Sequence, residues 1–228
     1  MKKINKYVLI STLTIISVLT FAFSNSISEG VITYTIDMSD IKDLNSDPNM
    51  AAMFENAKML ISFNDKFVKT EVDMGMVNVI TIADLKNSVV TSLMDMMGNK
   101  IALELNNEEF EKQEALEKDL SIEYLDETKE IAGYKCNAAI IKSTADISTK
   151  VYYTKDIQLN GRKFVNGMNS KLPGAALEFE VSNQCMNIRF TATKIEQKKL
   201  SNDIFDIPSG YEKMTQDELM KMMKNPGQ

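Results

Sequence analysis

Hydrophobic and polar residues alternate along much of the chain, which is the pattern of strands with one buried face. Residues 31–38 show it most clearly, because the even positions are Ile, Tyr, Ile and Met, whereas positions 33, 35 and 37 are Thr, Thr and Asp. Similar short apolar or alternating runs are 59–63, 68–72, 77–83, 88–95, 100–105, 121–125, 135–142, 150–154, 175–181, 186–195 and 204–207. Their spacing, often roughly 10–12 residues, predicts an antiparallel sheet that wraps towards a barrel.

Turn residues separate many of these runs. Asn64-Asp65, Asp73-Met-Gly75 and Met97-Gly98-Asn99 are expected to join neighbouring strands. Gly133 is expected at a turn or a bulge, and Pro173-Gly174 at a turn that leads into the run 175–181.

Three other segments show helical patterns. Asp47-Pro48 combines an N-cap residue with proline at the first helical position. Apolar residues then follow at the spacing of one helix face, namely Met50, Met53, Phe54 and Ala57. Residues 107–118 are rich in charge and carry Glu–Lys pairs four residues apart, which predicts a solvated helix or a connecting arm.

The third helical segment is expected over residues 215–224. Thr215 and Glu218 have the spacing of a capping box, and the apolar face is formed by Leu219, Met220 and Met223. We therefore expect an α+β protein in which a strongly curved antiparallel sheet, a half-barrel, is flanked by two or three short helices.

The N-terminus has the three parts of a signal peptide. Three lysines and no acid occupy residues 1–6, residues 7–23 are uncharged and mainly apolar, and small residues at Ala22 and Ser24 suit a signal peptidase. We therefore expect residues 1–24 to be removed and residues 25–228 to form one domain exported across the inner membrane, periplasmic or secreted. The alternative is an uncleaved membrane anchor, because the uncharged stretch is almost long enough to span a bilayer. A lipid anchor is not expected, because the first cysteine is Cys136.

Composition excludes several classes of function. The chain has no histidine, which removes imidazole-activated nucleophiles and His-ligated metals. Without residues 1–24, 23 basic residues face 32 acidic ones, and the net charge of −9 argues against nucleic acid as a partner. No G-x-G-x-x-G motif or P-loop is present, and the run Asp43-x-Asn45-x-Asp47 lacks the glycine and glutamate of a calcium loop. We therefore expect no cofactor and no metal. We also expect that the protein is not an enzyme.

The two cysteines leave two interpretations open. In an oxidising compartment, Cys136 and Cys185 could form a disulfide that closes a loop of 49 residues. They could instead be two buried thiols that pack as small hydrophobic side chains. The disulfide is the interpretation that we favour from sequence.

Four segments resemble a known family. Glu127-Thr-Lys-Glu-Ile-Ala-Gly-Tyr-Lys-Cys136 and Val151-Tyr-Tyr-Thr-Lys-Asp-Ile157 look like paired signatures of small exported proteins from Gram-negative envelopes, a domain of unknown function similar to the GLPGLI family. Leu172-Pro-Gly174 and Phe205-Asp-Ile-Pro-Ser-Gly-Tyr211 are similar to further segments of such domains. The resemblance covers roughly residues 29–214. It implies a curved antiparallel sheet similar to LolA-like lipoprotein carriers, and it implies no catalytic residue.

The sequence favours a non-catalytic envelope protein that binds an apolar or lipidated ligand in the hollow of the sheet. The chain has 16 methionines, and flexible Met-rich faces adapt to ligands of variable shape. The candidate ligand-binding residues are Met50, Met53, Phe54, Leu219, Met220 and Met223. Both helical faces could instead close the core of the sheet. The alternative function is a structural or interaction protein of an envelope complex, whose protein partners the sequence does not identify.

Overall fold

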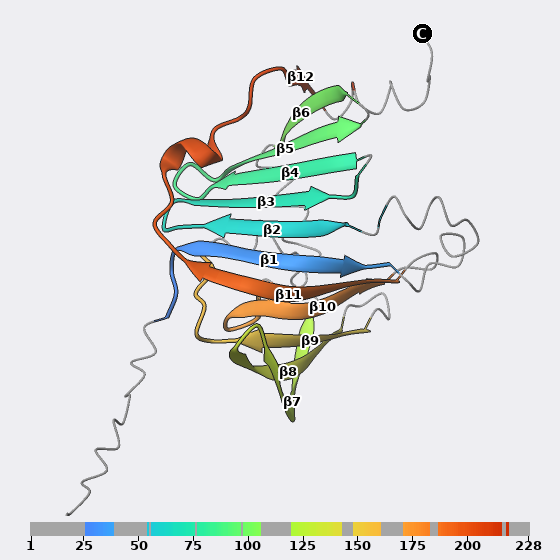
Figure 1. The fold of residues 1–228 in the computed structure, drawn as a ribbon, viewed down its shortest axis with the longest axis vertical. Helices are drawn as coiled ribbons and strands as arrows, with labels where there is room; N and C mark the ends of the chain where they lie inside the picture. Colours follow the sequence, from blue (N-terminus) through green and yellow to red (C-terminus); the bar gives the residue numbers. More distant parts are fainter. Residues whose placement is uncertain are drawn as a thin grey trace, which may run out of the picture.

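A computed structural model describes residues 26–38, 54, 56–75, 77–96, 98–105, 120–142, 148–160, 171–182, 187–215 and 218. Its strands form one sheet of twelve, in the order β12-β6-β5-β4-β3-β2-β1-β11-β10-β9-β8-β7 (Figure 1). The strands are β1 Gly30–Asp37, β2 Lys58–Phe63, β3 Phe67–Asp73, β4 Val77–Asp84, β5 Val89–Met96, β6 Asn99–Leu105, β7 Ser121–Ile131, β8 Tyr134–Lys142, β9 Ser148–Thr154, β10 Ala175–Ser182, β11 Asn187–Gln197 and β12 Glu212–Met214.

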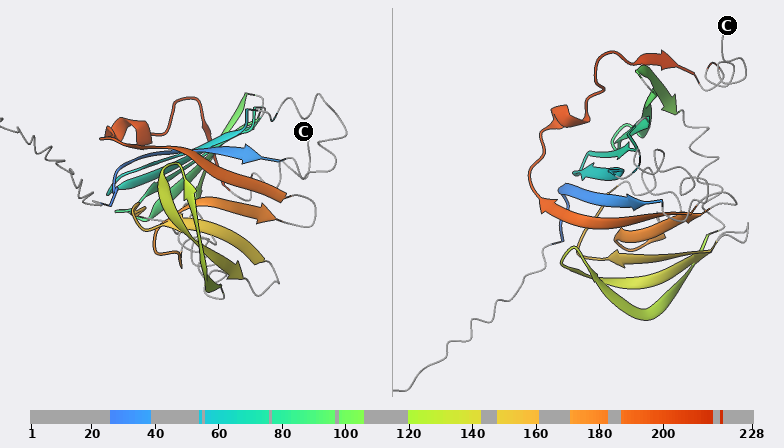
Figure 2. Two further views of the ribbon diagram at one scale, coloured as in Figure 1. Left: turned by 60° about the horizontal axis from the view of Figure 1, so that its bottom comes forward. Right: turned by 45° about the vertical axis from the view of Figure 1, so that its right-hand side comes forward.

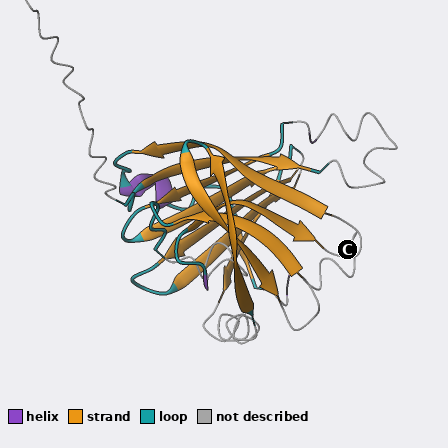
Figure 3. Cartoon of the chain, turned by 90° about the horizontal axis from the view of Figure 1, so that it is seen from below, coloured by secondary structure: helices purple, strands orange, loops and turns teal. Residues whose placement is uncertain are grey.

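The sheet consists of two antiparallel meanders. Strands β1 to β6 follow one another in space as they do in sequence, and so do strands β7 to β11. The two meanders join where β1 pairs with β11, and β12 adds to the far edge as the parallel neighbour of β6. The sheet curves strongly, so that its β7–β9 end is inclined to the other strands (Figure 2), and the view from below shows the same open curve (Figure 3).

Alternation along each strand separates the two faces of the sheet. Cross-strand partners point to the same face, so Ile32 and Ile61, which pair between β1 and β2, both belong to the inner core. Tyr34 is 1% exposed on this face, and its hydroxyl donates a hydrogen bond to the carbonyl of Ala176 in β10. The curvature thus packs side chains from both meanders into one core.

The outer face is covered at the β3–β6 end by the segment after β11. This segment contains a short 3-10 helix, η4 Asn202–Phe205, whose Phe205 packs with Ile80, Leu93 and Ala102. The Phe205 ring stacks on the Phe67 ring of β3, with 5.2 Å between their centroids. The segment ends in β12, where the chain reaches the opposite edge of the sheet from β7.

The expected α+β class is wrong, because the described residues are almost entirely sheet. Among the described residues, η4 is the only helix whose first and last residues are both described. Side chains of the curved sheet itself form much of the inner core. Most residues of the three expected helical segments lie outside the described residues. Phe54 and Ala57 form a single turn, in which the Ala57 N–H donates to the Phe54 carbonyl. The capping-box hydrogen bonds between Thr215 and Glu218 are present, as expected.

The expected strands and turns are confirmed with few exceptions. The Asn64 side chain accepts hydrogen bonds from the N–H groups of Lys66 and Phe67, and Gly75 and Gly98 adopt positive φ. The run 204–207 is not a strand, because η4 turns Phe205 into the outer core and leaves Ile207 45% exposed. Strand β12 was not expected from the sequence, since only one of its three residues is apolar. Within the described part of the chain, no helix has the length and apolar character needed to cross a membrane.

Candidate functional site

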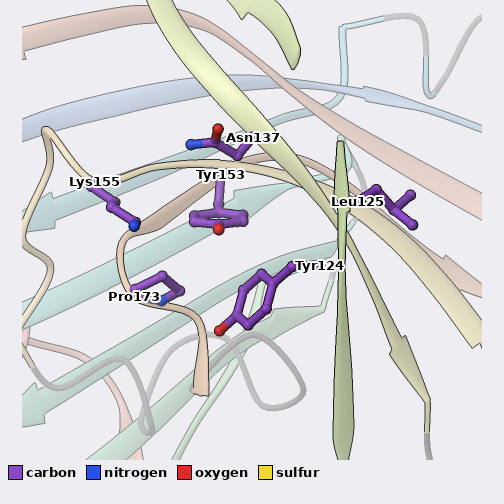
Figure 4. A pocket seen from close by; sticks show the side chains of 6 residues that line it. All are labelled: Tyr124, Leu125, Asn137, Tyr153, Lys155 and Pro173. Carbon is purple, nitrogen blue, oxygen red and sulfur yellow. The ribbon is translucent and has the colours of Figure 1, made fainter. Parts of the chain in front are cut away.

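A cavity of about 460 Å³ lies near the β7 edge of the sheet (Figure 4). Its lining combines two phenol rings, two apolar side chains, an amide and an ammonium group. These side chains belong to Tyr124, Leu125, Asn137, Tyr153, Lys155 and Pro173. They come from β7, β8, the end of β9 and the turn before β10.

Strand pairing brings the centre of the cavity together. Tyr153 of β9 lies opposite Asn137 of β8, so their side chains share the inner face of the sheet. The Tyr153 ring is 4% exposed and belongs to the inner core. Lys155 follows two residues later, just beyond the end of β9, and its side chain extends towards Tyr153 (Figure 4).

An irregularity in β7 forms one wall of the cavity. Tyr124 pairs with Ala139 and Thr128 pairs with Asn137, so β7 has two more residues than β8 between these pairs. Such a bulge bends a strand and changes the direction of its side chains. Tyr124 is 58% exposed although it is aromatic, and its ring centroid lies 6.1 Å from that of Tyr153. The bulge therefore places an exposed ring above a buried one.

Ion pairs attach the bulged part of β7 to β9 and β10, which lie beyond its neighbour β8 in the sheet. The Glu127 carboxylate accepts hydrogen bonds from the Lys150 ammonium, at 2.8 and 2.9 Å, and from the Tyr152 hydroxyl. The hydrogen bond from Lys150 is the largest cause that lowers the pKa of Glu127, and the same bond raises the pKa of Lys150. The Lys129 ammonium lies 2.7 Å from the Glu178 carboxylate of β10. Each exposed pair contributes little stability, but together they fix where β7 lies.

A glycine allows the turn before β10 to approach β9. A Cβ atom at Gly174 would lie 1.8 Å from the carbonyl oxygen of Thr154, a distance that no side chain tolerates. Only glycine therefore lets the backbone beside Pro173 lie against the end of β9. Pro173 and Lys155 line the cavity from these two adjoining segments.

The lining favours ligands that combine an apolar part with hydrogen-bond acceptors. Burial, and then the nearby Tyr124, raises the pKa of Tyr153, which keeps this phenol neutral. Lys155 supplies a positive charge, and the Asn137 amide can donate or accept hydrogen bonds. Among the described residues that line the cavity, none carries a carboxylate. Among the described residues, no group of three cysteine or acidic side chains could bind a metal ion.

The cavity is not the site expected from the sequence. Met50, Met53, Leu219, Met220 and Met223 lie outside the described residues. Phe54 is half-buried and packs against the inner core, but it does not line the cavity. Sequence reasoning missed the actual lining residues, although three of them lie in segments that carry the family resemblance: Tyr153 and Lys155 in 151–157, and Pro173 in 172–174.

The cysteines do not contribute to the cavity. Cys136 is fully buried in β8, and its thiol lies 3.5 Å from the carbonyl oxygen of Tyr134, to which it donates. Burial, followed by the nearby Glu178 carboxylate, raises the pKa of Cys136 to about 11, so the thiolate is strongly disfavoured. Cys185 lies outside the described residues, so the expected disulfide stays a prediction.

Comparison with known proteins supports the fold alone. No protein-family model and no curated protein matches the chain. Among solved structures, the chain is similar to a structure of PNGF-II in space group C2, with 17% identity and a TM-score of 0.51. That match covers 84% of this chain but only 31% of PNGF-II. A crystal structure of MucB matches at 8% identity and a TM-score of 0.37, covering 82% of this chain and 60% of that one, which is too weak to support an argument.

Proposed function

We propose that the protein is a non-catalytic binding protein of the cell envelope that takes an apolar or lipidated ligand. The observation that carries this proposal is the cavity at the β7 edge, whose volume of about 460 Å³ lies within the range of small-molecule sites. Its opening is bordered by the exposed Tyr124 ring, which would contact the ligand. An aromatic side chain at a binding site offers a large apolar surface and a polar end.

The envelope location rests on the N-terminal residues. Three lysines, an uncharged stretch and small residues near Ser24 support export, with residues 1–24 as the signal peptide. The resemblance to small exported envelope proteins supports the same location. We propose a periplasmic or secreted protein.

A second candidate function is an interaction protein of an envelope complex. Among the described strands, β7 is the end strand of the sheet and has 11 residues, so none of them pairs with the outer side of its backbone, which would allow another strand to pair there. The bulge between Tyr124 and Thr128 interrupts this edge and makes continuous pairing with a partner strand less favourable. We therefore place this function second.

A neutral fluorescent dye tests the proposed function. N-phenyl-1-naphthylamine is apolar and should bind the mature wild-type protein with an increase in fluorescence. We expect Tyr124→Ala to weaken binding roughly fivefold, because it removes the aromatic contact at the opening. Ile207→Ala is the matched control, since Ile207 is an exposed apolar residue that does not line the cavity. Wild-type protein that binds no dye would reject the proposal and leave the interaction function in first place.

A further inference from the structure

We infer that the ligand of this cavity is an amphiphile that carries an oxyanion, a carboxylate or a phosphate, which binds to Lys155. This inference rests on the proposed function, because it specifies the chemistry of the ligand in the same cavity. It follows from the charge state of the lining and from the way in which neighbouring basic residues are paired.

Four basic residues on β7, β8, β9 and β11 have carboxylate partners. The ammonium groups of Lys142 and Lys150 each lie within 2.8 Å of a glutamate of β7, and Lys129 and Arg189 pair with glutamates of β10. The Lys155 ammonium forms no ion pair or hydrogen bond with the described residues, and its backbone carbonyl alone accepts a hydrogen bond, from Gln158. Lys155 therefore remains available to a ligand.

The remaining polar groups of the cavity favour binding of an anion beside the Lys155 ammonium. Asn137 and Lys155 both lie beside the Tyr153 ring, whereas Tyr124 and Leu125 lie on the other side of the cavity (Figure 4). The ammonium and the amide can both donate to an oxyanion, and hydrogen bonds between charged groups are stronger than neutral ones. None of the described residues that line the cavity carries a carboxylate that would compete for Lys155.

The apolar side chains of the cavity indicate that the rest of the ligand, away from its anionic group, is apolar. The Tyr124 ring, Leu125 and Pro173 supply hydrocarbon surface to the same lining as the ammonium. A small inorganic anion would leave this surface exposed, and a neutral hydrocarbon would leave Lys155 without a partner. A short alkyl chain that ends in an oxyanion satisfies both parts of the lining.

Three ligands with the same chain test the inference. Decanoate, decyl phosphate and decanol are titrated below their micelle concentrations, and displacement of the bound dye is measured at low salt. We expect one or both anions to bind wild-type protein about tenfold more tightly than decanol, which corresponds to roughly 1.4 kcal/mol. The tighter of the two anions identifies a carboxylate or a phosphate as the preferred group. Added sodium chloride should reduce this preference.

Substitutions of Lys155 test whether this residue causes the preference for anionic ligands over decanol. Lys155→Met removes the charge but keeps much of the chain length, so anion binding should weaken towards that of decanol while decanol binding stays unchanged. Lys155→Arg should retain the preference, and Lys199→Met is a control at an exposed lysine that does not line the cavity. Equal binding of all three ligands by wild type, or an anion preference that survives Lys155→Met, would overturn the inference and leave the proposed function intact. If neither the dye nor any of the three ligands binds, the proposed function itself fails.

Discussion

Individual residues fix the geometry of the β7–β8 hairpin. Its two turn residues, Ala132 and Gly133, both have positive φ, 50° and 82°. A two-residue hairpin turn with positive φ at both positions matches the right-handed twist of its strands and is usually occupied by Asn-Gly or Gly-Gly. Alanine has a Cβ atom and adopts this conformation at a cost in free energy. The strain lies in the hairpin that carries Tyr124 and Asn137.

Ala132→Asn should therefore stabilise the protein. Asparagine tolerates the left-handed conformation better than alanine, so the free energy of unfolding should increase by about 0.5–1 kcal/mol. Gly133→Ala is the opposite change, and we expect it to lower the free energy of unfolding by about 1 kcal/mol because no other atoms lie near the added Cβ and only the strain acts. Urea denaturation measures both. A destabilised Ala132→Asn variant would show that the strain at this turn is not the controlling factor.

At the scale of elements, the sequence predicted strands well where one face of the strand is buried. The alternation from Ile32 to Ile36 reflects burial on one face of β1, so the same physical cause produces the pattern and the strand. Strand β7 was predicted only as far as Leu125, because Asp126–Glu130 are polar, exposed residues on an edge strand and show no alternation. Their place in the strand depends on pairing with β8, which local sequence does not encode.

The candidate site could be predicted only in part. Residues 151–157 and 172–174 attracted attention through the family resemblance, yet the chemistry of Tyr153 and Lys155 was not recognised there. The cavity depends on the bulge at Tyr124 and on the close approach at Gly174, and both follow from strand register. Register is a property of paired strands, so a single strand sequence does not reveal it.

The disulfide between Cys136 and Cys185 stays a prediction. Cys136 is fully buried in β8, and Cys185 lies outside the described residues. In an oxidising compartment this pair would close a loop of 49 residues, whereas two buried thiols would pack as small hydrophobic side chains.

Thiol labelling decides between the two interpretations. Mature protein that is unfolded without reductant should take up no label, because we expect Cys136 and Cys185 to be joined in the disulfide. Alkylation followed by intact-mass measurement counts the labels, and a reduced sample provides the reference for complete labelling. Two labels on each monomer before reduction would reject the disulfide and would favour two free thiols.

At the scale of the whole molecule, the segment after β11 connects the two meanders. It starts in the centre of the sheet, runs along the outer face through η4 and ends beside β6 at the edge. The Leu200 N–H donates a hydrogen bond of 2.7 Å to the Glu29 carboxylate, which ties the segment to the chain just before β1. Phe205 anchors it over β4 to β6, at the other end of the molecule from the cavity.

Removal of the Phe205 anchor should lower stability without changing ligand binding. Phe205 is 4% exposed, so Phe205→Ala loses the buried ring and its stacking on Phe67, at a cost of about 3 kcal/mol in the free energy of unfolding. Ile207→Ala, two residues away and 45% exposed, should change stability by less than about 0.5 kcal/mol. Urea denaturation of both variants measures the difference, and dye titration under folding conditions should give wild-type affinity for each. Equal stability of the two variants would mean that the segment contributes nothing to the outer core. A weaker dye affinity in Phe205→Ala would mean that the β4–β6 end and the cavity are energetically coupled across the joined strands β1 and β11.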